Sequence, residues 1–371
     1  MKILAVHTIG WDKNKTKEKA TCLWRIKRPI DELKNHVDWQ IDEQPTPIPE
    51  FIKYKSEEEF TPEEMEKAAK KLGKYDIIWS GYFFNPSFYA LYRVVNARYG
   101  TKFVMDIDDD LFSIKIDNPV WFKLSDENVY NAQCMVRDVD FITVTTEKLA
   151  ETIRSKRPDK PPESVMVVPN LIPKEYEQRA QDNDPVTIGY FGGSSHIFDI
   201  DKSGMIEAVE KIMNEDKTVK FVSCGIPIEK YLPRARYTYL EGIGGEDWVT
   251  KMFPQLNFDI SLAPLEPCLF ADGKSNIKFL ESTRMGAAFV ATNTGPYMSL
   301  LNGVNAVLVD NTPDAWYRAI KRLVDNKKAR QLLVEEAKKE VRKYTLEAHW
   351  DVIQDMFTKV KNNVAYSKII H

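Results

Sequence analysis

Asp272-Gly-Lys-Ser-Asn-Ile-Lys-Phe-Leu-Glu281 follows an apolar strand pattern at residues 258–262 and a proline-containing loop. Small polar residues at 273–276 precede a helical pattern whose first turns carry Lys278 and Glu281. The free N–H groups at a helix N-terminus bind phosphate, and a nearby lysine adds positive charge. A carboxylate two turns into the helix can accept hydrogen bonds from ribose hydroxyls. The segment therefore predicts a site for a nucleotide diphosphate.

Strand and helix patterns alternate on both sides of this segment. In the first half of the chain, strand patterns lie at 3–6, 76–79, 103–106, 141–145 and 165–168. In the second half, they lie at 187–191, 220–223, 237–240, 258–262, 288–291 and 306–309. Such alternation predicts an α/β protein whose parallel sheets are covered by helices on both faces.

The chain of 371 residues is long for a single hydrophobic core, so two domains are expected. The polar, proline-flanked segment 173–185 is interpreted as a linker. It separates an N-terminal Rossmann-like domain at 1–172 from a C-terminal Rossmann-like domain at 186–345. Two doubly wound domains that face each other across a cleft would bring together the carboxyl ends of their strands, where ligands bind.

Composition is that of a globular protein outside the membrane. Hydrophobic residues make up 43% of the chain, charged residues 29%, and the net charge is −3, which leaves no overall basic footprint for nucleic acid. The four cysteines are far apart in the sequence, so neither a disulfide framework nor a zinc site is expected. No apolar run approaches the length of a transmembrane helix, and the N-terminus has no signal-peptide pattern. The expected location is the cytoplasm, or the host cytoplasm for a viral protein.

A second motif completes a family resemblance. Gly189-Tyr-Phe-Gly-Gly-Ser-Ser-His196 follows the first strand of the second half and places glycines where backbone can approach phosphates. Together with the Lys278 and Glu281 helix, it resembles the donor-binding signature of GT-B glycosyltransferases, specifically the retaining family 4. The resemblance implies that the last helix, within 346–371, crosses back to the N-terminal domain. It also implies sugar transfer from a nucleotide diphosphate sugar, taken as a UDP-sugar, with retention, and with neither a tightly bound cofactor nor a metal.

The resemblance assigns roles to residues of the C-terminal half. Lys278 would neutralise the departing diphosphate and Glu281 would bind the ribose. The full set of predicted donor-binding residues is Gly192, Gly193, Ser194, His196, Lys274, Ser275, Asn276, Ile277 and Glu281. Two departures from the family pattern stand out: Gly273 replaces the first of two glutamates, and no basic residue follows the glycine loop. Lys274 or His196 is therefore expected to assist Lys278.

A carboxylate cluster, Asp106-Ile-Asp-Asp-Asp110, ends a strand of the first half. Clustered carboxylates repel one another and are costly to bury without a cation or hydrogen-bond donors. Asp108 and Asp109 are the catalytic candidates, for orienting or deprotonating an acceptor hydroxyl. Two alternatives remain open: a metal site like the DxD motif of the GT-A fold, and a solvated turn in which Asp110 caps a helix.

The acceptor is less well defined. A basic segment at 12–19 with Lys15 and Lys17, followed by Arg25 and Arg28, predicts a contact for an anionic acceptor, although a solvated loop is the simpler interpretation. The favoured acceptor is a saccharide or glycolipid. A phage-type DNA glycosyltransferase acting on a hydroxylated base is the alternative within the same chemistry.

The sequence also bears on two other classes of function. Non-hydrolysing nucleotide-sugar epimerases share the GT-B fold, but they need carboxylates and a histidine around the sugar in the C-terminal domain. Here the carboxylate cluster lies in the N-terminal half, which disfavours an isomerase. A non-catalytic sugar-binding protein is indicated only by the missing first glutamate.

Overall fold

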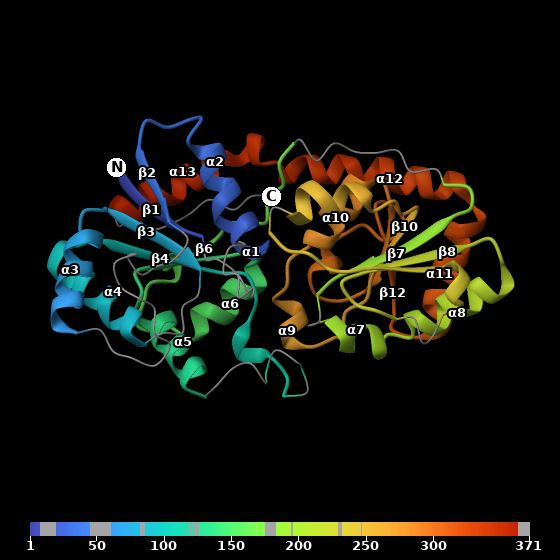
Figure 1. Ribbon diagram of the computed structural model, residues 1–371, viewed down its shortest axis with the longest axis horizontal. Coiled ribbons are helices and arrows are strands. Elements are labelled where there is room, and N and C mark those ends of the chain that lie inside the picture. Colours follow the sequence, from blue (N-terminus) through green and yellow to red (C-terminus); the bar gives the residue numbers. More distant parts are fainter. Residues whose placement is uncertain are drawn as a thin grey trace. The chain divides into compact units, whose positions relative to one another are not determined.

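The protein forms two compact units, each built around its own sheet (Figure 1). The computed structural model describes residues 1–7, 20–44, 61–81, 86–116, 118, 121, 126–174, 183–193, 196–228, 232–245 and 247–362. Unit 1 comprises Met1–Ser113, Phe122–Leu171 and Leu346–His371, and unit 2 comprises Ile114–Trp121 and Ile172–Thr345. The chain thus passes between the units beside residues 172 and 346, and the short segment Ile114–Trp121 also belongs to unit 2.

The sheet of unit 1 has six parallel strands in the order β2-β1-β3-β4-β5-β6. They are β1 (Lys2–Val6), β2 (Gln40–Gln44), β3 (Ile77–Gly81), β4 (Lys102–Ile107), β5 (Phe141–Val144) and β6 (Val165–Val167). The order reverses direction between β1 and β3, which is the switch point of a doubly wound sheet. Five of these strands match the predicted strand patterns.

The exception is β2, which the sequence analysis missed. Its residues Gln-Ile-Asp-Glu-Gln contain one apolar side chain, so neither alternation nor an apolar run marks the strand. It lies at the edge of the sheet and pairs with β1 from Lys2↔Gln40 to Val6↔Gln44. Backbone pairing to a buried neighbour therefore makes this strand, and its polar side chains suit an exposed edge.

Helices cover both faces of the sheet of unit 1. They are α1 (Ala20–Cys22), the π-helical turn η1 (Leu23–Lys27), α2 (Arg28–Leu33), α3 (Pro62–Leu72), α4 (Pro86–Tyr99), α5 (Asp126–Asp138), α6 (Glu147–Ser155) and α13 (Leu346–Asn362), with 3-10 turns η2 (Leu111–Ser113) and η4 (Pro162–Ser164). One core packs α3, α4, α5 and α6 on one face, and the other packs α2 and α13 on the opposite face. Thr146 accepts a hydrogen bond from the Leu149 N–H and caps α6.

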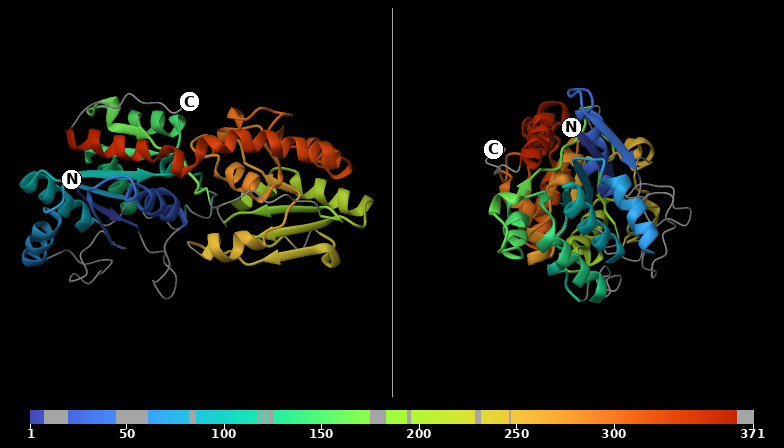
Figure 2. Two further views of the ribbon diagram at one scale, coloured as in Figure 1. Left: turned by 90° about the horizontal axis from the view of Figure 1, so that it is seen from above. Right: turned by 90° about the vertical axis from the view of Figure 1, so that its left-hand side faces the viewer.

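The last described helix, α13, packs within unit 1 although the sequence before it builds unit 2. Its Trp350 ring stacks on His36 with centroids 4.1 Å apart, and Phe357 meets Trp79 of β3 edge to face at 5.4 Å. Lys361 donates to Asp76 at 2.6 Å. The helix lies alongside α2 and along the sheet (Figures 1 and 2). These contacts tie the C-terminal segment to the unit that the chain begins with.

The sheet of unit 2 also has six parallel strands, in the order β12-β11-β10-β7-β8-β9. They are β7 (Thr187–Phe191), β8 (Lys220–Cys224), β9 (Tyr237–Leu240), β10 (Ile260–Ala263), β11 (Ala288–Thr292) and β12 (Val307–Val309). All six were predicted. The switch point lies between β7 and β10, so the ligand site of this doubly wound sheet is expected where those two strands end.

Helices flank this sheet as well. They are α7 (Ile197–Asp201), α8 (Met205–Glu215), α9 (Leu269–Asp272), α10 (Ile277–Met285), α11 (Pro313–Asp325) and α12 (Lys327–Val341), with π-helical η8 (Trp248–Met252) and 3-10 turns η7 (Arg234–Arg236), η9 (Phe253–Gln255), η10 (Gly295–Ser299) and η11 (Arg342–Tyr344). Helices α8 and α11 lie side by side and share one core with the sheet (Figure 1). Helix α10 packs near β11 and α12.

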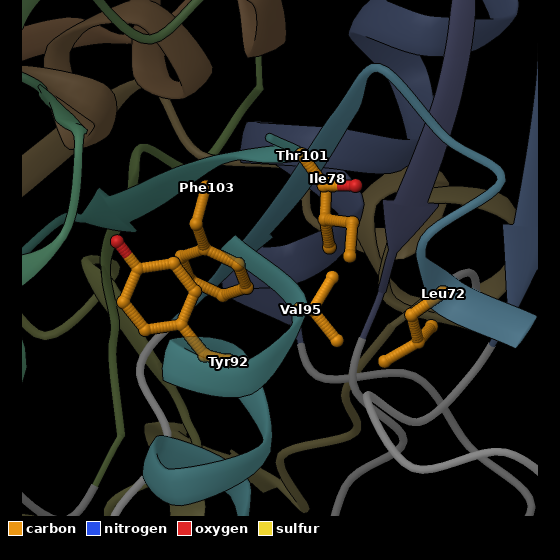
Figure 3. A pocket seen from close by; sticks show the side chains of 6 residues that line it. All are labelled: Leu72, Ile78, Tyr92, Val95, Thr101 and Phe103. Carbon is orange, nitrogen blue, oxygen red and sulfur yellow. The ribbon is translucent and has the colours of Figure 1, made fainter. Parts of the chain in front are cut away.

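A small apolar pocket in unit 1 lies between α3, α4 and the strands β3 and β4 (Figure 3). Its lining is Leu72, Ile78, Tyr92, Val95, Thr101 and Phe103. The two polar groups in that lining have partners elsewhere: the Tyr92 hydroxyl reaches Asp140 at 3.2 Å and the Thr101 hydroxyl donates to the Tyr75 carbonyl at 2.8 Å. The pocket is thus a packing gap in a core, without free polar groups to orient a ligand.

All four cysteines are free thiols, as expected from their spacing. Among the helices that the structure describes, none combines the length and the apolar character needed to cross a membrane.

Candidate functional site

The candidate site is built around helix α10. The helix begins after Asn276 and ends at Gly286, whose φ of 81° is left-handed and favours glycine. Lys278 and Glu281 are three residues apart and therefore share one face of the helix. Both are buried, at 9% and 6% exposure. Two ionisable groups buried on one face of a helix are costly for folding alone, so the pair marks a candidate site.

Lys278 reaches from α10 to the end of β7. Its ammonium donates a hydrogen bond to the Phe191 carbonyl and lies 4.8 Å from the centre of the Tyr190 ring. Burial lowers the pKa of Lys278 to about 8, while the nearby Glu281 opposes that shift. The amine therefore stays mostly protonated at neutral pH. Lys278 thus lies beside the glycine loop, at the switch point of the sheet.

Gly192 has a structural reason to be glycine. A Cβ at this position would lie 2.5 Å from the Tyr190 hydroxyl and 2.7 Å from the Lys278 ammonium. A side chain would therefore push out the lysine. Gly193 differs, because among the described residues no atom outside its chain neighbours lies within 4 Å of the position that a Cβ would take there. The backbone at Gly193 is thus open on that side, and this is the part of the loop that a phosphate can approach.

Glu281 is held by an aromatic residue that the sequence analysis did not single out. The indole N–H of Trp248, in η8, donates to Oε1 of Glu281 at 2.8 Å. Burial raises the pKa of Glu281 to about 7, while the Trp248 hydrogen bond and Lys278 act in the opposite direction. Glu281 is therefore divided between its charged and neutral forms near neutral pH.

His196 lies at the start of α7, after the glycine loop. Its Nδ1 lies 2.7 Å from Oδ2 of Asp199, and Oδ1 of Asp199 accepts the Glu266 N–H at 2.7 Å. Burial, followed by the charge of Lys278, lowers the pKa of His196 to about 4. The ring is thus neutral at pH 7. As a neutral ring, His196 can assist Lys278 by hydrogen bonding and not by charge.

Tyr190 is a further polar group beside Lys278. Its ring is fully buried, and its hydroxyl has no hydrogen-bond partner among the described residues. Burial raises the pKa of this phenol well above its usual value, so the hydroxyl keeps its proton. A buried hydroxyl without a hydrogen-bond partner is uncommon. The Tyr190 hydroxyl is therefore available to donate a hydrogen bond to a ligand.

The other predicted donor residues lie in the turn that leads into α10. Lys274 holds its ammonium 4.3 Å from the centre of the Phe270 ring, and Asn276 shares a side-chain hydrogen bond with Tyr344. Ile277 is the first residue of the helix, directly after Ser275 and Asn276. The turn is thus held by α9 before it and by η11 behind it.

The aspartates of the carboxylate cluster in unit 1 do not all have the same role. Asp106 is inside β4 and forms a buried ion pair with Arg25, each side chain being 3% exposed. The guanidinium donates to both carboxylate oxygens, at 3.0 and 2.8 Å, and to the Val168 carbonyl at 2.6 Å. Arg25 was predicted to contact an acceptor. Its donors instead join β4 to the end of β6, so its observed role is structural.

The rest of the cluster follows the strand. Burial raises the pKa of Asp108 to about 7, and the neighbouring carboxylates of Asp109 and Asp106 add to the shift. Asp110 is buried and accepts the Phe112 N–H at 3.0 Å, so it caps the short turn η2. Asp108 and Asp109 therefore remain the members of the cluster able to act on a ligand.

Several predicted residues have other placements. Arg28 is the first residue of α2 and is half-buried. Ser194, Lys15 and Lys17 lie outside the described residues. Within the part of the chain that the structure describes, no group of three or more His, Cys, Asp or Glu side chains is arranged to hold a metal ion.

The family of unit 2 follows from its sequence. Residues 187–326 match the family described as Glycosyl transferases group 1. The match begins with β7 and ends after α11, and it includes the glycine loop and α10 with Lys278 and Glu281. Unit 2 is a glycosyltransferase domain of group 1. Comparison with curated proteins gives no match for the chain.

Solved structures extend the likeness to both units. Sucrose-phosphate synthase from Thermosynechococcus elongatus aligns with a TM-score of 0.67 at 12% identity, covering 98% of this chain and 100% of that one. Anabaena Alr3699/HepE in complex with UDP-glucose gives 0.62 at 13% identity, covering 97% and 100%. TarM gives 0.60 at 15% identity, and there the alignment covers 81% of this chain but only 58% of TarM. These likenesses confirm the GT-B fold.

Tertiary contacts add two residues of the group 1 domain that had no predicted role. Trp248 is 33 residues from Glu281 in the sequence, and Tyr190 lies in the strand that begins the glycine motif. The one available signal for Trp248 was an aromatic residue shortly after the glycine pair at 244–245, which is weak by itself.

Proposed function

We propose that this protein transfers a sugar from a UDP-sugar to an acceptor hydroxyl, with retention of configuration and without a metal ion. The observation that carries the proposal is the buried pair of Lys278 and Glu281 on α10, beside the glycine loop of a group 1 domain. Solved neighbours of the same fold include HepE bound to UDP-glucose and S. aureus TarM bound to UDP. The proposed acceptor is a saccharide or glycolipid.

The proposed chemistry is largely electrostatic. The bond between the anomeric carbon and the β-phosphate oxygen breaks, and its electron pair remains on the phosphate. Lys278 and the N–H groups of the glycine loop stabilise that charge. The acceptor oxygen bonds to the same face of the anomeric carbon, and its proton passes to the departing phosphate. Asp108, whose pKa lies near neutral, or Asp109 would orient the acceptor hydroxyl.

A panel of nucleotide sugars tests the proposal. UDP release from at least one UDP-sugar is expected, either as slow hydrolysis or faster with a saccharide acceptor. Conversion of the sugar without nucleotide release would instead identify an epimerase. Binding without either reaction would identify a non-catalytic sugar-binding protein.

The same assay tests the metal requirement. We expect UDP release to be unchanged by EDTA, because a protonated lysine and helix or loop N–H groups replace the cation at the diphosphate. Loss of activity with EDTA, restored by manganese or magnesium, would contradict this. It would point to Asp108 and Asp109 as metal ligands.

The basic segment at 12–19 provides a test of the acceptor. If the acceptor is anionic, reversing its four lysines should weaken acceptor use and leave UDP binding intact. The variant replaces Lys13, Lys15, Lys17 and Lys19 with glutamate. For a DNA acceptor, affinity should also fall steeply with salt, because neutralised phosphates release counterions. Unchanged acceptor kinetics at every salt concentration would exclude DNA and favour a neutral saccharide.

A matched control reverses four exposed lysines of unit 2 that belong to neither the glycine loop nor α10. These are Lys217, Lys220, Lys327 and Lys328. It changes the net charge by the same amount, so any effect shared by both variants comes from overall charge and not from the segment.

A further inference from the structure

Trp248 lies beside the candidate site but belongs to a different element from the motif residues. It opens η8, and its backbone N–H reaches the Gly245 carbonyl at 3.1 Å. Its ring packs against Phe191 with centroids 5.6 Å apart, and against Phe253 at 6.4 Å. The indole is therefore fixed in position by aromatic neighbours, one of which supplies the carbonyl that Lys278 binds.

The two carboxylate oxygens of Glu281 differ in their hydrogen bonding. Oε1 accepts the Trp248 N–H at 2.8 Å, whereas Oε2 accepts no hydrogen bond from any described residue. An ionised carboxylate oxygen can accept more than one hydrogen bond, so Oε2 remains available to a donor from a ligand. Ribose hydroxyls are donors of the right kind. A carboxylate with one oxygen already held is also restricted in rotation, which reduces the ordering cost of binding.

We propose that Trp248 is a positioning residue for the nucleotide: its indole N–H holds Oε1 of Glu281 and so presents Oε2 to the ribose hydroxyls. The inference rests on the proposed function, because it takes the ligand to be a UDP-sugar. It assigns the role to a hydrogen bond from η8, an element that the donor motif does not contain.

Affinity for the nucleotide is expected to depend on pH. The Trp248 hydrogen bond favours the ionised form of Glu281, which burial disfavours, and the pKa of Glu281 lies near 7. The titratable groups facing Glu281 among the described residues are Lys278 on α10 and Tyr297 in η10. If the ionised carboxylate binds ribose, affinity falls as pH drops through about 7. It also falls as pH rises through about 8, where Lys278 loses its proton.

The test uses the full chain and UDP-glucose, measured by calorimetry across neutral pH. UDP-glucose is preferred to UDP because a terminal phosphate would itself titrate at a pKa of about 6. Trp248→Phe removes the N–H donor and keeps an aromatic ring. We expect its affinity to fall about 5- to 10-fold near neutral pH. We also expect the fall in affinity at low pH (the acid limb) to move to higher pH. The fall in affinity at high pH (the alkaline limb) should be unchanged.

Three further variants make the result specific. Trp350→Phe makes the same chemical change on α13 of unit 1, where the ring stacks on His36, and should leave affinity unchanged. Glu281→Gln should abolish the acid limb. In the Glu281→Gln background, adding Trp248→Phe should have little further effect, because the tryptophan acts through the carboxylate.

The outcomes separate this inference from the proposed function. Wild-type affinity retained by Trp248→Phe at every pH would overturn the inference and leave the proposed function standing. An equal loss in the Glu281→Gln background would also overturn it, since the indole would then contact the nucleotide directly. If Trp248→Phe does not fold, Glu281→Gln provides the test. An acid limb that persists in Glu281→Gln would overturn the inference, because Glu281 would not be the group that titrates. Absence of binding of every UDP-sugar in the panel by the wild-type protein would overturn both.

Discussion

Arg25→Met is expected to lower the stability of unit 1 by about 3–5 kcal/mol, because it leaves the Asp106 carboxylate buried without its partner. The guanidinium donates to both oxygens of Asp106 and to the carbonyl of Val168, and neither charged side chain is more than 3% exposed. Among the described residues, only the hydroxyl of Thr143, at 2.6 Å, would still donate to the carboxylate. Urea denaturation followed by circular dichroism measures the effect.

An exposed ion pair of the same unit serves as the control. Arg98 pairs with Glu66, and both side chains are more than half exposed. Arg98→Met should therefore change stability by less than about 1 kcal/mol. The double variant Arg25→Met/Asp106→Leu should recover part of the loss, since it removes the uncompensated charge. Equal, small effects of Arg25→Met and Arg98→Met would show that the buried pair is not a structural element.

Lys278→Met is expected to weaken UDP-glucose binding about 10- to 150-fold, which corresponds to losing a charge-assisted contact of about 1.5–3 kcal/mol. Methionine keeps most of the buried stem and removes the charge. Transfer should fall further than binding, because the charge on the leaving phosphate grows during bond breaking. Calorimetry gives the affinity, and UDP release gives the rate.

Lys211 provides the matched control for this prediction. It lies on α8 of the same unit, with its ammonium 3.9 Å from the centre of the Tyr317 ring, and belongs to no candidate site. Lys211→Met should leave affinity and rate unchanged. Normal UDP-glucose affinity and turnover in Lys278→Met would remove the lysine from the donor site and, with it, the main support for the proposed function.

Local sequence patterns were sufficient for most of the fold. Apolar runs bounded by turn residues marked all six strands of unit 2, and Thr146 marked the start of α6. These features can be predicted because a strand or a helix cap depends on neighbouring residues. The polar strand β2 could not be predicted, because it forms only when β1 offers its backbone as a partner.

Charge states were not predictable in the same way. The sequence places His196 beside the glycine loop without showing its charge, and burial and the charge of Lys278 keep the ring neutral. The sequence predicts Arg25 as a contact for an acceptor, yet its guanidinium is enclosed between β4 and the end of β6. Burial sets the cost of a charge, and burial depends on which distant segments pack around the side chain.

The sequence by itself determined the alternation of strands and helices, the glycine loop and the lysine and glutamate of α10, because each is written in residues close together. Only the tertiary structure decided which distant groups those residues contact. Lys278 binds a carbonyl 87 residues away, and Glu281 accepts an indole 33 residues away. Such contacts depend on how α10 and η8 pack against the ends of β7 and β10. Packing brings together segments that are far apart in the sequence, and no local pattern indicates which segments will meet.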